Sequence, residues 1–454
     1  MTLWKGRFEK PMSQAMAKIG QSLVTDMRLF PYEIEVNRAY SIALQKVGVL
    51  NEEDVQKIHV ALDEMLNEYE AGEYTTRKYT DEDVHSLIER RLTTKAGPAG
   101  AKIHTGRSRN DLMLADVHLY LRDQCQLMKK QIGDLGRALL RQADKHMGTV
   151  LPGYTHMQRA QPISLAHYLY SFCFYLYEDA KRIDTVLEGQ LALFPLGAGA
   201  IAGSGFPIDR ELMARRLGFK GVSENSIQTI SSRDEFLELG SALAMVMVHL
   251  SRYAEDLIIW STREFNFVEL DDSVTTGSSM MPQKKNPDSL ELIRGKAARI
   301  IGDLQTLFTL HKGLPLTYAR DLQEDKPALF DMIENTEISL EMFTEVIATI
   351  KVNVEVMEGS LSSELIATDL ADYLVKKGVA FRESHEVIAN LFKSLSLGGT
   401  LTMKDLKAAS PLFEDDAEKI LDPKEAVKLR DVLGGTGPES LMRQKRILSR
   451  YFSG

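Results

Sequence analysis

The sequence predicts an all-α protein built mainly from long helices. Apolar residues recur at helical spacing over stretches of about 25 residues or more, and clear alternating strand patterns are scarce. The chain has 454 residues, of which 44% are hydrophobic and 26% charged. These values are typical of a globular protein with two or three domains.

The first clear helix is predicted between Asn51 and Gly72. Asn51 is suited to an N-cap, and Gly72 is suited to end the helix. Between them, apolar residues keep to one face, at Val55, Ile58, Ala61, Leu62, Met65 and Leu66.

Longer helical patterns follow at 111–147, 163–192, 234–264, 288–312 and 327–355. They lack a sustained heptad, which favours a helical bundle over a coiled coil. In the third pattern apolar residues surround much of the helix, at Leu237, Leu239, Leu243, Met245, Val248 and Leu250. Such a helix is buried on most sides, either in one deep core or against other subunits, and both alternatives remain open.

Frequent glycines and prolines after about residue 360 shorten the predicted helices. We therefore expect a small C-terminal helical domain at 361–454. The long helices would form a central bundle at 111–360, preceded by an N-terminal helical domain at 1–110.

Charge and cysteine content limit the possible partners and compartments. The net charge is −9, and the Lys and Arg residues are scattered, which argues against nucleic acid or an anionic membrane as partner. The two cysteines, Cys125 and Cys173, fit a reducing cytosol. The N-terminus lacks an apolar signal region, and the apolar stretch 191–203 is short and broken by Pro195. We expect a cytoplasmic protein without a membrane span.

The segment Gly277–Pro287, GSSMMPQKKNP, is predicted to be a loop. Its glycine and two prolines disfavour helix. Asn286 is suited to cap a following helix, with Pro287 at its first position and Asp288 in its first turn. Hydroxyls, amines and an amide would then lie beside a helix N-terminus, which favours bound anions. The alternative is a solvated loop with a capped helix.

Three further polar clusters stand out, each with an alternative structural interpretation. In 102–111, Arg109 could bind a carboxylate, but Ser108 or Asn110 could simply cap a helix. In 153–162, a short connector between two long helices, His156 could transfer protons or be structural. The charged link 318–327 could also be a solvated loop.

Two weaker signals point to structure, not to a cofactor or metal. The glycine-rich segment 197–205 lacks both the P-loop lysine and the dinucleotide spacing, so we expect a structural turn. Glu82, Asp83, His85 and Glu89 could suggest a metal, but such charges usually face solvent. We expect neither a metal nor a cofactor.

Four segments together resemble one family. They are HTGRSRND at 104–111, GYTHMQRAQP at 153–162, GSSMMPQKKNP at 277–287 and YARDLQEDK at 318–326. The third is similar to a frame shared by the fumarate-releasing lyases of the fumarase/aspartase superfamily. The set resembles the argininosuccinate lyases in particular, in order from Trp4–Phe8 onward. Leu112 and Val36-Asn37-Arg38 depart from the family pattern and could tune substrate affinity.

The resemblance implies a carbon–nitrogen lyase that cleaves argininosuccinate to L-arginine and fumarate in arginine biosynthesis. In this family the first serine of the loop is thought to abstract the proton, which implies Ser278 as base. His156 would donate to the leaving nitrogen or give electrostatic support. Lys284 and Asn286 would stabilise the aci-carboxylate.

The resemblance also implies substrate-binding residues, position by position. Those for the carboxylates are Ser22, Arg109, Asn110 and Thr155. Those for the arginine end are Tyr318, Gln323, Lys326 and, in an acidic arginine-side pocket, Asp83.

The family fold implies three helical domains, with the central bundle forming a twenty-helix core in a homotetramer. Each active site would be shared between subunits. The alternatives are another fumarate-releasing lyase, such as adenylosuccinate lyase or aspartase, and a non-enzymatic relative like the lens crystallins. The charged segment 318–326 argues against adenylosuccinate lyase, and the presence of all four catalytic residues argues against a crystallin.

Overall fold

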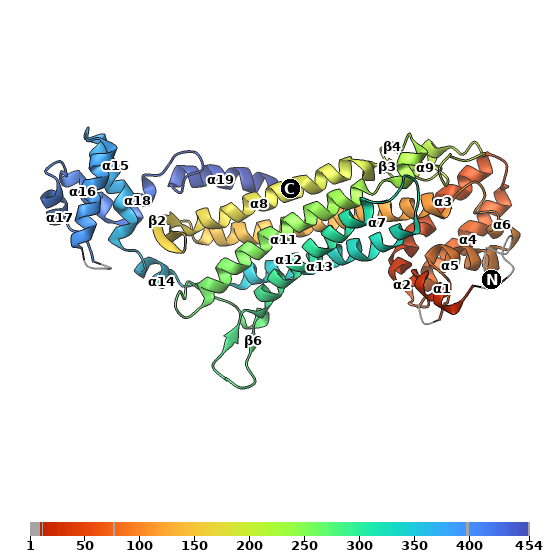
Figure 1. Cartoon of the computed structure of the whole chain (residues 1–454), viewed down its shortest axis with the longest axis horizontal. Coiled ribbons are helices and arrows are strands. Elements are labelled where there is room, and N and C mark those ends of the chain that lie inside the picture. Colours follow the sequence, from red (N-terminus) through yellow and green to blue (C-terminus); the bar gives the residue numbers. More distant parts are fainter. Residues whose placement is uncertain (1–9, 11, 76–77, 396–398, 453–454) are drawn as a thin grey trace. The chain divides into compact units, whose positions relative to one another are not determined.

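The protein is helical throughout most of its length (Figure 1). The computed structural model describes residues 10, 12–75, 78–395 and 399–452, so the segment Trp4–Phe8 lies outside the described residues. Among the described helices, none is long and apolar enough to cross a membrane.

The chain divides into two compact units. The first comprises residues 1–128, 182–244 and 300–334. Its short helices and strands are α1 (Gln14–Ile19), α2 (Leu23–Asp26), η1 (Met27–Leu29), α3 (Phe30–Lys46), α4 (Glu52–Glu70), α5 (Val84–Ala96), α6 (Pro98–Ala101), η2 (Gln190–Ala192), β3 (Leu193–Phe194), α9 (Arg210–Arg216), β4 (Gly221–Val222), α10 (Ser226–Ser231) and η4 (Arg320–Glu324).

The second unit comprises residues 129–181, 245–299 and 335–454. Its short elements are β1 (Val150–Thr155), β2 (Gln158–Ser164), β5 (Val268–Glu269), η3 (Asp272–Val274), β6 (Thr276–Gly277), β7 (Lys285–Asn286), β8 (Lys351–Val352), α14 (Val354–Gly359), η5 (Ser363–Ile366), α15 (Ala367–Lys376), α16 (Phe381–Ser394), α17 (Met403–Ala409), η6 (Asp415–Leu421), α18 (Pro423–Lys428) and α19 (Pro438–Phe452).

Five long helices contribute residues to both units, and all five were predicted from periodicity. They are α7 (Arg109–Lys145), α8 (Leu165–Glu188), α11 (Asp234–Ser261), α12 (Asp288–His311) and α13 (Asp325–Thr349). Each agrees with its predicted range to within about six residues at either end. Fraying of helix termini accounts for about one or two of these residues, and the others belong to the adjoining loops. The all-α prediction is confirmed.

Two of these helices differ in how much apolar surface the chain itself covers. In α11, Leu239, Leu243 and Leu250 are fully buried, whereas Met245 is exposed. In α12, Leu292, Ile301 and Phe308 are all exposed. The helix that the sequence marks as most apolar is therefore largely covered within one chain, and α12 retains apolar surface.

The N-terminal cap of α4 follows the prediction. The Asn51 side chain accepts a hydrogen bond from the backbone N–H of Asp54, and the Asp54 carboxylate accepts from the backbone N–H of Asn51. This reciprocal capping box satisfies two donors that the first turn of a helix leaves free.

Strands are few but one pair is substantial. β1 and β2 form an antiparallel hairpin in which Thr155 pairs with Gln158 across a two-residue turn. The other pairs, β3–β4, β5–β8 and β6–β7, have two residues in each strand. The hairpin was predicted only as a short connector, because its sequence lacks the usual glycine or asparagine turn signal.

The C-terminal part of the second unit contains its own apolar core. This core joins α15–α18 and includes Leu370, Leu374, Leu406 and Phe413. The division into domains at 1–110, 111–360 and 361–454 stays a prediction.

Candidate active site

The sequence-predicted site residues fall into two groups, one in each compact unit. Seven lie in the first unit, at Ser22, Asp83, Arg109, Asn110, Tyr318, Gln323 and Lys326. Five lie in the second unit, at Thr155, His156, Ser278, Lys284 and Asn286.

In the first unit, Ser22 and Lys326 meet at one buried carboxylate. The Ser22 hydroxyl donates to Asp26, and the Lys326 Nζ lies 3.6 Å from Asp26 Oδ1. Asp26 and Lys326 are only 1% and 4% exposed. A lysine held by a buried carboxylate presents its charge in a fixed position, which suits binding of an anionic group.

A second set of contacts surrounds Asp83 and Arg109. Asp83 caps α5 by accepting from the backbone N–H of Ser86 at 2.8 Å. The Arg109 guanidinium lies 2.8 Å from Asp83 Oδ2 and donates to the Ser86 hydroxyl at 2.9 Å. Burial raises the pKa of Asp83, but the charges of His85 and Arg109 hold it below its ordinary value. The two predicted binding residues are thus bound to each other.

Backbone contacts link these two sets. The backbone N–H of Ser22 donates to the Glu82 carbonyl at 2.8 Å. Arg320 donates to the Glu82 carboxylate at 2.7 Å and to the Gly20 carbonyl at 2.9 Å, and Gln323 donates to the same carbonyl at 3.3 Å. The segments around residues 20–26, 82–86, 109 and 320–326 therefore form one connected polar region.

A buried ion cluster at His85 holds α5, the helix that begins beside this polar region. His85 Nδ1 lies 2.7 Å from Glu33 Oε2 and 3.5 Å from Asp116 Oδ2, and the potential ligand atoms of the three residues lie within 4.8 Å of one another. Burial lowers the pKa of His85, but the charge of Glu33 and its hydrogen bond raise it above the ordinary value. An imidazolium bound to the Glu33 carboxylate accounts for this arrangement. Burial and the charge of Glu33 raise the pKa of Asp116 well above its ordinary value, which favours its neutral form.

The four residues considered as a metal set do not share one centre. Glu82 and Asp83 approach Arg109, His85 contacts Glu33, and Glu89 pairs with His104. The four side chains therefore have three different sets of partners.

The start of α13 is fixed by a buried ion pair. Arg233 Nε donates to Asp325 Oδ2 at 2.7 Å, and both side chains are 1% exposed. Because Lys326 follows Asp325 directly, this pair positions Lys326. Tyr318 precedes the same segment, and burial raises the pKa of its phenol.

The glycine-rich segment is a turn, as predicted, and its partner was not foreseen. The backbone N–H groups of Gly197 and Gly199 donate to Asp111 Oδ2 at 2.9 and 2.7 Å. The backbone N–H of Ser108 donates to the other carboxylate oxygen at 2.9 Å. Asp111 thereby holds the start of α7, next to Arg109 and Asn110. The Ser108 hydroxyl accepts from the backbone N–H of Asn110, so the capping alternative holds for Ser108.

In the second unit, the 277–287 loop projects beyond α11 and α12 (Figure 1). The Ser278 Oγ accepts hydrogen bonds from the backbone N–H groups of Met280 at 3.2 Å and Met281 at 3.0 Å. Met280 at the tip is 87% exposed. The serine is thus held by its own loop, and the loop tip is in solvent.

The two adjacent lysines of this loop differ in their contacts. Lys285 Nζ lies 2.6 Å from Asp272 Oδ1 and 3.3 Å from Glu269 Oε1, and its hydrogen bond to Asp272 raises its pKa. Lys284 is exposed and has no ion-pair partner in the described part of the chain. Lys285 therefore anchors the loop, and Lys284 is available for a ligand.

The predicted capping role of Asn286 is wrong. Asn286 lies in β7, where it pairs with Thr276, and its side-chain amide donates to the Gly277 carbonyl at 3.5 Å. The Pro287 carbonyl instead accepts the first backbone N–H groups of α12, from Leu290 and Glu291. Asn286 does not cap α12 because it belongs to the short β6–β7 pair, which joins the two ends of the loop.

Thr155 and His156 lie at the exposed tip of the β1–β2 hairpin. His156 and Met157 have φ values of 54° and 58°, as a type I′ turn requires. Few side chains adopt this conformation without strain, so the turn displays His156 in a defined orientation at some conformational cost.

The hairpin and the 277–287 loop stand at separate places in the second unit (Figure 1). Within that unit of a single chain, the loop that carries Ser278 and the hairpin that carries His156 are therefore not neighbours.

Sequence reasoning missed several residues that hold the predicted ones. Glu82, considered only as a possible metal ligand, approaches Arg109. Asp26, Arg233 and Arg320 each contact a predicted residue or its neighbour. Their only signal in the sequence is an acidic or basic residue close to a predicted one. That signal is common on any surface.

Comparison with known proteins decides the family. A family model described as "Lyase" matches residues 6–302, and one described as "Argininosuccinate lyase C-terminal" matches residues 364–428. The argininosuccinate lyase of Geobacillus sp. (strain WCH70) is 45% identical over 98% of this chain and 99% of its own. That of Geobacillus thermodenitrificans is 46% identical over 96% of this chain and 95% of its own. The chain belongs to the argininosuccinate lyase family.

Solved structures place this argininosuccinate lyase family member in a wider fold group. An EDDS lyase in complex with formate superposes with a TM-score of 0.84, at 29% identity over 96% of this chain and 88% of that one. A class II fumarase from Schistosoma mansoni gives a TM-score of 0.74 at 16% identity, over 91% and 92% of the two chains, and shows the shared fold.

Proposed function

We propose that this chain cleaves argininosuccinate to L-arginine and fumarate, in a reversible elimination. The observation that carries the proposal is the 45% identity to an argininosuccinate lyase along almost the whole chain. The four motifs of the family are all present, and the polar region of the first unit has the mixture of cations and carboxylates that this substrate requires.

The difficult step is the loss of a proton from the carbon beside a carboxylate. The electrons left behind give that carboxylate a second negative charge, and the guanidino nitrogen then leaves the neighbouring carbon. Fixed donors and cations aimed at the developing charge lower the barrier, and each is typically worth about 10²–10³ in rate. The available ammonium of Lys284 and the amide of Asn286 suit this role.

Ser278 is our candidate for the base. A serine hydroxyl is a weak base unless its alkoxide is stabilised. The two backbone N–H groups that donate to Ser278 Oγ support the assignment, because hydrogen bonds to a charged form favour that form. Lys284 adds a positive charge to the same loop.

His156 would then supply a proton to the leaving guanidino nitrogen, or support the charge there. Its place at the tip of a strained hairpin turn favours a positioned role over a packing role. Thr155, next to it, would bind a substrate carboxylate.

The first-unit residues would bind the rest of the substrate. Ser22, Arg109 and Asn110 would bind carboxylates; Tyr318, Gln323, Lys326 and Asp83 would bind the arginine end. Since Arg109 is bound to Asp83 and Lys326 to Asp26, substrate enters a region whose charges are already oriented. Such preorganisation reduces the cost of binding.

We further propose a homotetramer whose active sites are shared between subunits. The separation of the 277–287 loop from the β1–β2 hairpin within one unit supports sharing, because a second copy can supply the missing segment. The exposed apolar side chains of α12 support self-association, and Gly295 and Gly302 leave open space on the same helix for a close neighbour.

The compartment we propose is the cytoplasm, with arginine biosynthesis as the pathway. Cys125 and Cys173 are both buried thiols, which fits a reducing environment.

One assay tests the proposal. Purified protein is incubated with argininosuccinate, and the ultraviolet absorbance of fumarate is followed. We expect fumarate and L-arginine to form in equal amounts. Fumarate from adenylosuccinate or aspartate instead would identify another lyase of the superfamily, and no turnover of any of the three would favour a crystallin-like role.

A further inference from the structure

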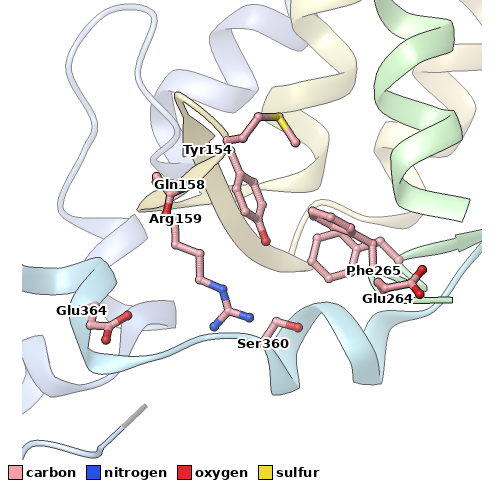
Figure 2. Close-up of a pocket in the computed structure, with 9 residues that line it drawn as sticks. Tyr154, Gln158, Arg159, Glu264, Phe265, Ser360 and Glu364 are labelled. Carbon is pink, nitrogen blue, oxygen red and sulfur yellow. The ribbon is translucent and has the colours of Figure 1, made fainter. Parts of the chain in front are cut away.

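A pocket of about 600 Å³ lies in the second unit beside the His156 turn (Figure 2). Three segments line it: the β1–β2 hairpin, the chain that follows α11, and the connection between α14 and η5. The lining residues are Tyr154, Met157, Gln158, Arg159, Glu264, Phe265, Phe267, Ser360 and Glu364. The proposed reaction uses none of these side chains.

Hydrogen-bond donors of two side chains converge in the pocket. The guanidinium of Arg159 points into it, toward Ser360, and the hydroxyl of Tyr154 faces the same space (Figure 2). The Ser360 hydroxyl is already used, because it donates to the Val356 carbonyl at 2.7 Å. Among the described residues, Arg159 has no ion-pair partner. A guanidinium with a phenol hydroxyl beside it is a set of donors that matches a carboxylate.

Two carboxylates lie on opposite sides of these donors. Glu364 lies on the same side of the pocket as Arg159, separated from its guanidinium by a gap, and Glu264 lies on the opposite side next to Phe265 (Figure 2). With one arginine and two glutamates, the lining carries a formal charge of −1. A ligand with two carboxylates would bring its second negative charge toward a glutamate. A ligand with one carboxylate and a net charge of +1 would bring its carboxylate to the donors and its cationic groups to the glutamates, and would balance the charge of −1.

Aromatic side chains form one wall. Phe265 packs against Tyr154 with ring centroids 5.6 Å apart, and against Phe267 at 5.5 Å. Such a wall suits the aliphatic part and the planar cation of an amino-acid side chain.

We propose that this pocket binds a cationic amino acid, of which L-arginine is the representative. Its carboxylate would bind to Arg159 and Tyr154, and its cationic groups to Glu264 and Glu364. The proposed binding of a cationic amino acid is argued from the pocket alone. A regulatory role for that binding rests on the proposed function, whose product is L-arginine.

Occupation of the pocket would act on the catalytic turn. Tyr154, Met157, Gln158 and Arg159 flank Thr155 and His156 on the same hairpin. A ligand bound to these residues restricts the hairpin and thus the position of His156. Arginine would then slow turnover without competing with argininosuccinate, as a product signal separate from the active site.

Direct binding is tested first. The full-length protein is titrated with L-arginine by calorimetry, and the emission of Trp260, whose ring lies 6.0 Å from that of Phe267, reports on the pocket. We expect one binding event that changes this emission. Two ligand controls lack one recognised group each: L-citrulline has no side-chain cation, and agmatine has no carboxylate. Each should bind at least about tenfold more weakly, because each loses a charge-assisted contact.

The variants Arg159→Gln and Glu364→Gln each remove one charge from the pocket. Both should weaken the same event by at least about tenfold. The matched control is Arg263→Gln, because Arg263 is exposed beside Glu264 and does not line the pocket. Its affinity should equal that of the wild type. Equal affinity in all four proteins overturns the proposal, and an unchanged melting temperature shows that each variant is folded.

Kinetics then test the regulatory role. Added L-arginine should lower the maximal rate of fumarate formation in the wild type and in Arg263→Gln, and this effect should be lost in Arg159→Gln. Purely competitive inhibition in every protein contradicts the regulatory role. A collapse of turnover in Arg159→Gln without added arginine would place that residue in the active site and overturn the proposal.

The test separates this site from the proposed function. If the protein binds L-arginine in the pocket but releases no fumarate from argininosuccinate, the site stands and the proposed function fails. If fumarate is released but the variants bind L-arginine like the wild type, the function stands and the site fails.

Discussion

The polar region of the first unit and the 277–287 loop of the second are both rich in charge, but they are held very differently. In the first unit, Asp26, Lys326 and Arg233 are almost fully buried and in contact with opposite charges. In the loop, Lys285 ties the base to Asp272, while Met280 at the tip lies in solvent.

This difference suggests a division of labour. A region whose charges are buried and paired keeps its geometry with or without substrate, which suits recognition. A loop that is tied only at its base can change conformation, close over substrate and exclude water. The predictions below test whether the first-unit residues serve substrate recognition and the loop residues serve the chemical step.

The largest effect is expected for Ser278→Ala. If Ser278 is the base, kcat should fall by about a thousandfold or more while substrate still binds, because general-base catalysis is lost and the binding residues remain. Steady-state and binding measurements check this. The matched control is Ser279→Ala, the next residue in the loop, which should stay within a few fold of the wild type. Near-normal turnover in Ser278→Ala would remove this serine from the mechanism.

The paired lysines give the next largest effect. Lys284→Ala should lower kcat by about 10²–10³ with little change in stability, because one stabilising charge is lost from the transition state. Lys285→Ala should chiefly loosen the base of the loop, with a smaller loss of kcat and greater susceptibility of the loop to proteolysis. Equal losses of kcat in Lys284→Ala and Lys285→Ala would contradict the different roles assigned to the two lysines.

A smaller effect, on binding, is expected for Lys326→Ala. KM for argininosuccinate should rise by about ten- to a hundredfold, since a preoriented charge contact is lost, and kcat should change less. Lys312→Ala, an exposed lysine in the segment between α12 and η4, serves as the control. If Lys326→Ala lowered kcat as much as Lys284→Ala does, the separation of recognition from chemistry would fail.

The smallest effect concerns stability against pH. The pKa of His85 is raised in the folded protein, so the folded state holds this proton more tightly than the unfolded chain. Its contribution to stability is complete below the ordinary histidine value of 6.5 and is lost as pH rises through the folded value.

Chemical unfolding at several pH values checks this. Above pH 6.5, the wild type should lose unfolding free energy with a slope of at most about 1.4 kcal/mol per pH unit, and His85→Gln should lack most of that slope. His385→Gln, at an exposed histidine, is the control. Identical slopes for the wild type and His85→Gln would show that the buried cluster does not hold the proton.

Long-range pairing explains what the sequence could and could not predict. Helical periodicity located the long helices, and the motifs made Ser278, His156 and Lys326 candidate site residues, which they stay. The partners Asp26 and Asp111 could not be predicted, because their contacts join segments far apart in the chain.

The second limit on prediction is that the local sequence around some residues allows two different roles. Lys284 and Lys285 are identical in the sequence, and only the positions of Glu269 and Asp272 show which one is tied down. The hairpin was missed because His156 and Met157 occupy turn positions where glycine or asparagine is the usual signal. Asn286 was expected to cap α12, since a single residue before a proline does not reveal the β6–β7 pairing.

Complementation between inactive variants tests most directly whether one copy supplies the catalytic loop and another the His156 turn. His156→Asn and Ser278→Ala proteins are purified separately, unfolded together, refolded as a mixture and assayed for fumarate release from argininosuccinate. We predict recovery of about a quarter of the wild-type activity, because in random tetramers about one site in four draws an intact Ser278 and an intact His156 from different copies. A mixture as inactive as its two parents, with tetramers present, would contradict the shared site.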